Sequence, residues 1–262
     1  MQQRDRWRRR GLVLGAVLAA AVAGAHHAPG AEAGGEGVPA VIKRVMPAVV
    51  RVFGRRSAAF RGVGAGIILT ADGTIVTHQL NVANVDEPTV VLADGRRLKA
   101  EILGTDNETE IAVIRVKAKG LPTLKFADSS RVRAGRWVLA IGNPFGLARE
   151  AEDDLSTNLG VITAYTRVPA GGFKYRGLVF LTDAQINPGS YGGALVDLDG
   201  NLVALNGRVI TSKDTNTQMG VALPVNDVLP VVIRIIKKSK ERQPATTRPT
   251  TEPADTGAVD SE

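Results

Sequence analysis

Three Asp-Gly pairs, each lying between two β-rich runs, constrain this chain more than any other feature of its sequence. The pairs are Asp72-Gly73, Asp94-Gly95 and Asp199-Gly200. Such pairs form tight turns between antiparallel strands because glycine adopts positive φ at little cost. Further β-rich runs follow at short intervals, namely EIAVIRV, RWVLAIG, GLVFLTDA and GVALPV, without long helical patterns between them. The sequence therefore predicts an all-β sandwich or barrel fold.

Helices are expected only near the two ends of this β-rich region. In VPAVIKRVMPAVV, apolar residues at helical spacing precede Pro47, which predicts a short helix that leads into a strand. Asn226 or Asp227 is expected to cap a late helix with Pro230 in its first turn and lysines at its end. Residues 239–262 are rich in Thr, Pro and acidic residues, and a disordered tail is predicted there.

The first 33 residues have the pattern of a secretory signal peptide and its lead-in. Five arginines and one aspartate occupy the first ten positions, ahead of the apolar run GLVLGAVLAAAVAGA, which is too short to span a bilayer comfortably. The cleavage site and the choice between Sec and twin-arginine export stay open, and an uncleaved anchor is the alternative. We expect a periplasmic or extracellular protein that contacts a membrane only through an uncleaved signal.

Composition excludes several classes of chemistry. The chain has no cysteine, so disulfides, thiolate metal sites and cysteine nucleophiles are excluded. Much of the net charge of +7 lies in the signal region, and no basic run with interleaved aromatic residues follows it, so no nucleic-acid partner is expected. Asp197, Asp199 and Asn201 resemble part of a cation loop, but a hairpin turn explains them better. We expect no metal and no cofactor.

Several motifs in order resemble the HtrA-type, or Deg-type, family of trypsin-like serine proteases. They are the Gly-x-Gly start at Gly64 and Gly66, then GTD, AIGNPFG, TDAQINPG and GGAL. The resemblance implies two packed six-stranded antiparallel barrels with the site between them, an N-terminal barrel over 38–127 and a C-terminal barrel over 128–238. It also makes the absence of the family's usual C-terminal PDZ domain an expectation.

The family's catalytic positions carry other residues here. In that family a serine attacks the peptide carbonyl, a histidine takes its proton, and an aspartate orients the histidine. Matched motif by motif, the histidine position is Leu80, the aspartate position is Glu110 and the serine position is Tyr191. We expect Glu110 to reach solvent or a new hydrogen-bond donor, because an unpartnered buried carboxylate is costly. The ring of Tyr191 is expected to plug the pocket or cover the cleft.

An alternative keeps catalysis with displaced residues. An active serine endopeptidase, involved in proteolysis and protein quality control, would use Ser190 as nucleophile and His78 as base, which requires about 2.6–3.2 Å between them. If the histidine segment is a helical turn, two residues rotate a side chain by about 200°. His78 is then expected at the surface, pointing away from the cleft, and Ser190 is expected to serve the turn.

A binding function follows from what the resemblance retains. The backbone N–H groups of Gly189 and Tyr191 are implied to form the family's oxyanion hole, because peptide donors do not depend on the side chain. We expect a pseudoprotease that holds unfolded or extended polypeptide along its β-strand edge. The candidate contacts are Asn206, Gly207, Arg208 and Val209. The oligomeric state stays open, and the acidic loop 147–158 is either a docking surface or a solvated loop.

Overall fold

The computed structural model describes residues 37–54, 62–150, 152–168, 174–212 and 217–242. The described fold belongs to one compact unit that begins at Val38. The expected signal peptide and residues 243–262 of the expected tail lie outside the described residues. Those two expectations therefore stay predictions.

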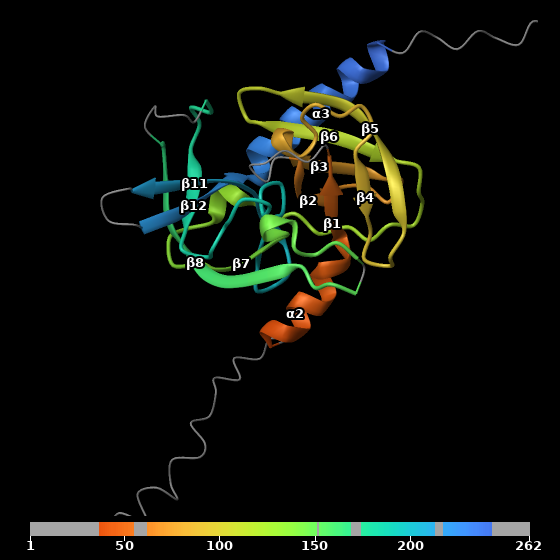
Figure 1. Ribbon diagram of the computed structural model, residues 1–262. Coiled ribbons are helices and arrows are strands. Elements are labelled where there is room, and N and C mark those ends of the chain that lie inside the picture. The colour runs from red at the N-terminus through yellow and green to blue at the C-terminus, as the bar shows by residue number, and fades with distance from the viewer. Residues whose placement is uncertain (1–36, 55–61, 151, 169–173, 213–216, 243–262) are drawn as a thin grey trace, which may run out of the picture. The chain divides into compact units, whose positions relative to one another are not determined.

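Six antiparallel strands close the first barrel in the order β1-β2-β3-β6-β5-β4 (Figure 1). Its strands are β1 (Val49–Phe53), β2 (Val63–Ile68), β3 (Thr74–His78), β4 (Thr89–Val91), β5 (Arg97–Asp106) and β6 (Ile111–Val116). A short 3-10 helix, η1 (Met46–Ala48), leads into β1, and another, η2 (Gln79–Asn81), follows β3 directly. The end of β3 is therefore the point at which extended chain becomes a helical turn.

The second barrel closes in the order β10-β11-β12-β9-β8-β7. Its strands are β7 (Trp137–Gly142), β8 (Ser156–Thr166), β9 (Val179–Thr182), β10 (Ala194–Asp197), β11 (Leu202–Ser212) and β12 (Thr217–Pro224). Two further 3-10 helices are η3 (Ser129–Arg131) and η4 (Pro144–Gly146). The two closed barrels confirm the expected double-barrel fold, and the expected boundary at 127/128 falls between β6 and β7.

The Asp-Gly pairs form hairpin turns, as expected. They connect β2 to β3, β4 to β5 and β10 to β11, and Gly73, Gly95 and Gly200 have φ of 100°, 87° and 80°. At Gly73 a Cβ atom would also lie 2.2 Å from the carbonyl oxygen of Val116. Glycine is needed there both for its conformation and for the close approach of the neighbouring strand.

Two helices flank the barrels, and the second, Val225–Arg242, begins earlier than expected. Asn226 and Asp227 lie inside it instead of capping it, because Ser129 Oγ accepts the N–H of Asn226 in its first turn, and Pro230 lies beyond that turn. Helix α2 (Val38–Val45) buries Val41 and Val45, and α3 (Val225–Arg242) buries one apolar face against the barrels. Helix α3 continues through residues 239–242, which were expected to begin the tail. Basic residues in its last turn favour this extension because they interact well with the carbonyl end of a helix. Among the described residues, no helix is long and apolar enough to cross a membrane.

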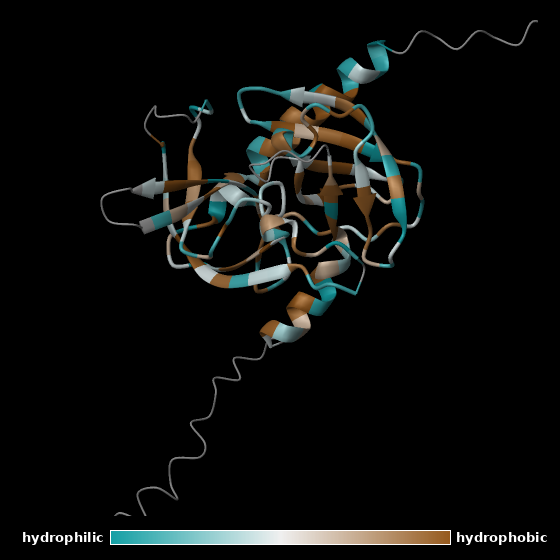
Figure 2. Cartoon of the chain, in the orientation of Figure 1, coloured by the Kyte–Doolittle hydropathy of each residue, from teal (hydrophilic) through white to brown (hydrophobic). Residues whose placement is uncertain are grey.

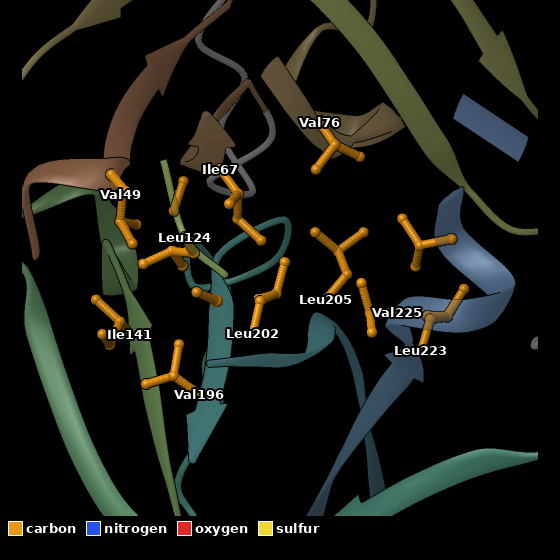
Figure 3. Close-up of a cluster of buried hydrophobic side chains, with 14 of the residues drawn as sticks. Val49, Ile67, Val76, Leu124, Ile141, Val196, Leu202, Leu205, Leu223 and Val225 are labelled. Carbon is orange, nitrogen blue, oxygen red and sulfur yellow. The ribbon is translucent and has the colours of Figure 1, made fainter. Parts of the chain in front are cut away.

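Three apolar clusters stabilise the fold, one inside each barrel and one between the barrels and helices. Figure 2 shows that apolar residues predominate along inner strands such as β2, β3 and β6. In the cluster between the barrels, Ile67 and Val76 of the first barrel point toward Leu202 and Leu205 of the second (Figure 3). This shared core holds the loops of one barrel in a defined position against those of the other.

Candidate functional site

His78 lies at the end of β3 and points into the protein interior. His78 is 2% exposed, and its backbone pairs with that of Ile111 in β6. The expectation of a surface histidine is therefore wrong. The reason is that residue 78 still belongs to the strand and the helical turn begins only at Gln79, so the expected rotation does not apply.

The imidazole of His78 has both of its nitrogen atoms engaged. Nδ1 accepts the backbone N–H of Leu80 at 3.2 Å, and Nε2 lies 3.6 Å from Oε2 of Glu110. A neutral imidazole that accepts at Nδ1 carries its proton on Nε2. Burial lowers the pKa of His78 and outweighs the opposing influence of Glu110, so the neutral form is favoured. The proton of His78 thus points at the carboxylate.

Glu110 accepts hydrogen bonds from a new donor, Arg208, which is one of the two outcomes expected for this carboxylate. Nε of Arg208 donates to Oε2 at 2.6 Å, and a terminal guanidinium nitrogen donates to Oε1 at 2.5 Å. Glu110 is 5% exposed, with φ of 58° in the left-handed region. Burial alone would raise the pKa of Glu110, but the facing His78 and Arg208 outweigh it and leave this pKa lowered. The carboxylate is therefore held ionised.

Arg208 reaches Glu110 from a bulge in β11. The pairing of β11 with β12 shifts between Asn206 and Val209, so Gly207 and Arg208 oppose one residue of β12. This side-chain role was missed in the sequence analysis, which named Arg208 only as a peptide contact. The two partners are separated by 98 positions in the chain, so no local pattern could have indicated the ion pair.

Tyr191 lies in the turn before β10. Its carbonyl oxygen accepts the side-chain amide of Asn81 at 2.8 Å and the N–H of Ala65 at 3.4 Å. The ring lies 5.5 Å from that of His78 and packs against the core of the second barrel. Burial raises the pKa of the phenol. The expectation that this ring plugs the pocket stays a prediction.

Ser190 faces the end of β7 instead of His78. The residue is 4% exposed, and a Cβ atom on Gly142 would lie 3.0 Å from its Oγ. Within the described part of the chain, no hydrogen bond joins Ser190 to His78. A base needs a free lone pair directed at the nucleophile. Because both nitrogens of His78 face other groups, the arrangement supplies no base to Ser190.

The backbone of the 187–193 turn keeps the shape that the resemblance implies. Gly189 has φ of 97°, and Ser190 donates its N–H to the carbonyl of Asn187 at 2.8 Å. Among the described residues, the N–H groups of Gly189 and Tyr191 have no hydrogen-bond acceptor. They remain the candidate donors to a ligand carbonyl or carboxylate.

Among the candidate peptide contacts, Asn206 already uses its side-chain amide and its backbone for hydrogen bonds within the protein. It is fully buried, its side-chain amide donates to the carbonyls of Ile141 and Ala194, and its backbone bonds to Gly192 and Gly193. An internal anchor of this kind cannot also receive a peptide, so Asn206 is corrected to a structural role. Gly207, Arg208 and Val209 stay predicted contacts, and the unpaired edge of β11 begins with them.

The acidic loop is tied to the first barrel. Glu150 pairs with Arg97 at 2.9 Å, and buried Arg51 of β1 donates to the carbonyl of Asp153. Asn143 holds the start of the loop through paired hydrogen bonds of 2.9 Å with Ala148. The segment from Ser156 onward belongs to β8, so the loop is shorter than expected.

The Asp-Gly turn at residues 197–201 is an internal structure. One carboxylate oxygen of Asp197 accepts the N–H groups of Asp199 and Asn201, and the other pairs with Arg136 at 2.9 Å. In the described residues, no cluster of three or more His, Asp or Glu side chains is arranged to hold a metal ion. These contacts explain Asp197 and Asp199 as parts of the hairpin turn.

Comparisons with known proteins point to one family. The model of the trypsin-like peptidase domain matches residues 64–205. A probable periplasmic serine endoprotease of DegP-like type from Halomonas elongata is 39% identical over 65% of this chain and 34% of its own. One from Ectopseudomonas mendocina is 34% identical over 75% of this chain and 40% of its own. The chain thus spans well under half the length of these relatives.

Solved structures agree with the sequence matches. The HtrA-type protease AlgW, solved with a tripeptide, superposes with a TM-score of 0.68 and 34% identity, over 78% of this chain and 64% of that one. The serine endoprotease from Yersinia pestis superposes with a TM-score of 0.64 and 31% identity, over 77% and 67%. The similarity therefore includes both barrels and the cleft between them.

Proposed function

This chain belongs to the trypsin-like peptidase family, with relatives of HtrA and DegP type, and we propose that it binds extended polypeptide without cleaving it. One observation carries the proposal. His78, the one histidine in the part of the chain that the structure describes, uses one ring nitrogen to accept a backbone N–H and turns the protonated one toward Glu110. The ring therefore has no free lone pair that could accept the proton of a serine.

The other catalytic positions support the same conclusion. Leu80 has no group that takes a proton, and the carboxylate of Glu110 is paired with Arg208. The phenol of Tyr191 is a weaker acid than usual because of its burial, so the nucleophilic phenolate is disfavoured at neutral pH. Backbone donors alone leave only about 10³–10⁴-fold acceleration over water, which is too little for a working protease.

The binding half of the proposal rests on the edge of β11. Strand β10 pairs with β11 only as far as Leu205, and beyond it β12 is the one neighbour among the described residues. An edge of this kind accepts an added strand through main-chain hydrogen bonds. The HtrA-type protease AlgW has been solved with a tripeptide and with a decapeptide, so peptide binding occurs in this family.

Export to the periplasm is part of the proposal. Relatives of this chain are named as probable periplasmic serine endoproteases. The first residues of this chain have the pattern of a secretory signal, and the absence of cysteine is compatible with an oxidising compartment.

Activity is tested with a fluorophosphonate probe and with casein. We expect neither labelling nor cleavage by the purified chain, with the matched Ser190→Ala variant giving the same background. Labelling of Ser190 that disappears in Ser190→Ala would show an active serine hydrolase and overturn the inactive assignment. The variant Leu80→His/Glu110→Asp/Tyr191→Ser tests whether the remaining frame supports catalysis once the three side chains are replaced.

Binding is tested by site-specific photo-crosslinking to a permanently unfolded polypeptide, such as reduced and carboxymethylated lactalbumin. The crosslinking amino acid replaces Ile210 on β11, which is 40% exposed, or Ile233 on α3, which is 52% exposed, as the control. We expect crosslinks from position 210 and none above background from position 233. Equal yields from both positions, or none from either, would contradict binding along β11.

A further inference from the structure

We propose that Phe145 and Leu147 form an apolar contact for one side chain of the bound polypeptide, on the side of the 187–193 turn that lies away from β11. This inference rests on the proposed peptide-binding function and adds which segments the site selects. It assigns a preference for extended segments that carry a large aromatic or aliphatic side chain close to the residue whose carbonyl the turn receives.

The short helix η4, which contains Phe145, lies directly against the turn. Phe145 donates its backbone N–H to the carbonyl of Pro188 at 2.7 Å, and Asn143 donates its own to the carbonyl of Gly189 at 3.3 Å. A Cβ atom on Gly189 would lie only 2.6 Å from the backbone N of Phe145. Phe145 is therefore a direct neighbour of Gly189, which carries one of the two candidate donors to a ligand carbonyl.

The turn separates this contact from the edge of β11. Strand β10, into which the turn leads, pairs with β7 on one side and with β11 on the other. Gly192 of the turn donates its N–H to the carbonyl of Asn206 in β11 at 2.7 Å, while Gly189 meets the segment that follows β7. A polypeptide that lies along β11 and places a carbonyl at the turn continues toward η4. Since an extended chain advances about 3.3 Å per residue, residues close together in one segment contact both sides.

Phe145 and Leu147 present apolar surface to solvent at this place. Phe145 is 41% exposed, and Leu147, two positions further along, is 72% exposed. Removing such surface from water is favourable, and neighbouring exposed apolar side chains mark interaction sites. The ligand chemistry that fits this surface is a large apolar side chain.

The backbone of η4 is held in a conformation that phenylalanine adopts only at a cost. Phe145 has φ of 56° and ψ of 9°, in the left-handed region that favours glycine. The side chain of Asn143 fixes the segment through two hydrogen bonds of 2.9 Å with Ala148, and a Cβ atom on Gly146 would lie 2.3 Å from Val63 of β2. Strain that is maintained by surrounding contacts is typical of functional sites. These contacts place Phe145 before a ligand arrives, which lowers the entropic cost of binding.

The first test places the photo-crosslinking amino acid at Leu147 of the purified full chain, with reduced and carboxymethylated lactalbumin as the probe. We expect crosslinks from position 147, mapped by mass spectrometry to lactalbumin segments with large apolar residues, and only background from position 233 on α3. Crosslinks from position 210 with none from position 147 would overturn the apolar contact and leave binding along β11 intact. Absence of crosslinks from both positions would overturn the proposed binding function and this inference with it.

The second test measures the affinity for the same lactalbumin. Leu147→Ala and Phe145→Ala should each weaken it by about five- to tenfold, because each removes apolar surface that the ligand covers. Ile233→Ala is the matched control, since Ile233 is 52% exposed on α3, and it should bind like the parent chain. Parent-like affinity of both alanine variants at positions 145 and 147, or equal weakening by Ile233→Ala, would overturn the contact.

Two further measurements separate lost contact from lost structure. Because Leu147 is 72% exposed, Leu147→Ala should leave the midpoint of urea denaturation unchanged while it weakens binding. Phe145→Leu keeps a large apolar side chain and should bind lactalbumin within about twofold of the parent chain. A lowered urea midpoint that accounts for the weaker binding of Leu147→Ala, or binding by Phe145→Leu as weak as that of Phe145→Ala, would contradict an apolar contact with the ligand.

Discussion

At the scale of single residues, the chemistry of the site depends on where the proton of His78 and the negative charge of Glu110 lie. In a catalytic arrangement the histidine offers a lone pair to the nucleophile and donates its proton to the acid. Here Nε2 of His78 still lies toward Glu110, 3.6 Å from its Oε2, but the lone pair on Nδ1 is used by the N–H of Leu80. Arg208 compensates the charge of Glu110 from the other barrel. The side chains of His78, Glu110 and Arg208 are therefore engaged with one another or with the backbone, and none of them is left as a base for a nucleophile.

The buried histidine predicts a loss of stability in mild acid. The pKa of His78 is lowered from its ordinary 6.5, so the unfolded chain binds a proton first as pH falls. The free energy of unfolding should drop by up to about 1.4 kcal/mol per pH unit below about pH 6.5. The lowered pKa of Glu110 acts in the same direction, but only below its ordinary 4.5.

Urea denaturation of the parent chain and of His78→Gln, compared between pH 7.5 and 5, checks this prediction. The variant should be less stable at pH 7.5 and should show a flatter pH dependence, because the groups facing residue 78, namely Glu110, Arg208 and Tyr191, do not titrate in that window. Parallel pH profiles for the two proteins would contradict it.

Arg208 is predicted to stabilise the fold mainly through Glu110. Replacing Arg208 with Met leaves a buried carboxylate with only the neutral His78 beside it, which should cost about 2 kcal/mol or more. The side chain of Arg208 is 34% exposed, so solvent screening keeps this cost below that of a fully buried pair.

A double-mutant cycle with Glu110→Gln isolates the pair. The double variant Glu110→Gln/Arg208→Met should be more stable than Arg208→Met alone, because the uncompensated charge is gone. Urea denaturation at pH 7.5 measures all four proteins, and additive losses would show that the two side chains act independently.

At the scale of elements, the cleft depends on the close approach of the 187–193 turn to β3. A Cβ atom on Gly192 would lie 2.5 Å from the N of His78 and 2.6 Å from the carbonyl oxygen of Ala65. The side-chain amide of Asn81 bridges the same gap, from the helical turn after β3 to the carbonyl of Tyr191. The junction is therefore held by the close backbone approach at Gly192 together with the side-chain hydrogen bond of Asn81.

Gly192→Ala should therefore destabilise far more than an ordinary glycine replacement at positive φ. Gly135 is the matched control, since its φ of 88° is close to the 82° of Gly192 but a Cβ atom there meets nothing within 4 Å. Gly135→Ala should cost about 1 kcal/mol for its backbone conformation. Gly192→Ala should cost at least about 2 kcal/mol more in urea denaturation, and equal costs would contradict the close approach.

At the scale of the whole molecule, the two barrels behave as one folding unit because they share a core. Leu205 of the second barrel is 2% exposed within the cluster that also contains residues of the first barrel and of α3. Arg234 of α3 also pairs with Asp106 of β5 at 2.5 Å. Neither barrel can lose its packing without exposing part of the shared cluster.

This shared core predicts a single cooperative unfolding transition. In a Trp7→Phe background, Trp137 of the second barrel is the only tryptophan, so its fluorescence should follow the same urea curve as the circular dichroism of the whole chain. Leu205→Ala should lower the free energy of unfolding by about 2–5 kcal/mol by both probes. Separate midpoints for the two probes would show independent barrels.

The sequence by itself determined the features that neighbouring residues encode. The Asp-Gly turns, the short strands between them and the two helices depend on backbone conformation within a few residues, so they were predictable. That Leu80, Glu110 and Tyr191 stand at the family's catalytic positions stays a prediction, drawn from motifs that keep their spacing.

Only the tertiary structure decided which side chains meet. His78 is buried because β3 continues to that residue before the chain turns, and Arg208 reaches a carboxylate 98 positions away through a bulge. The seat of Tyr191 likewise combines the core of one barrel with a histidine of the other. Such contacts depend on how the barrels pack, and packing is a property of the whole chain rather than of any local pattern.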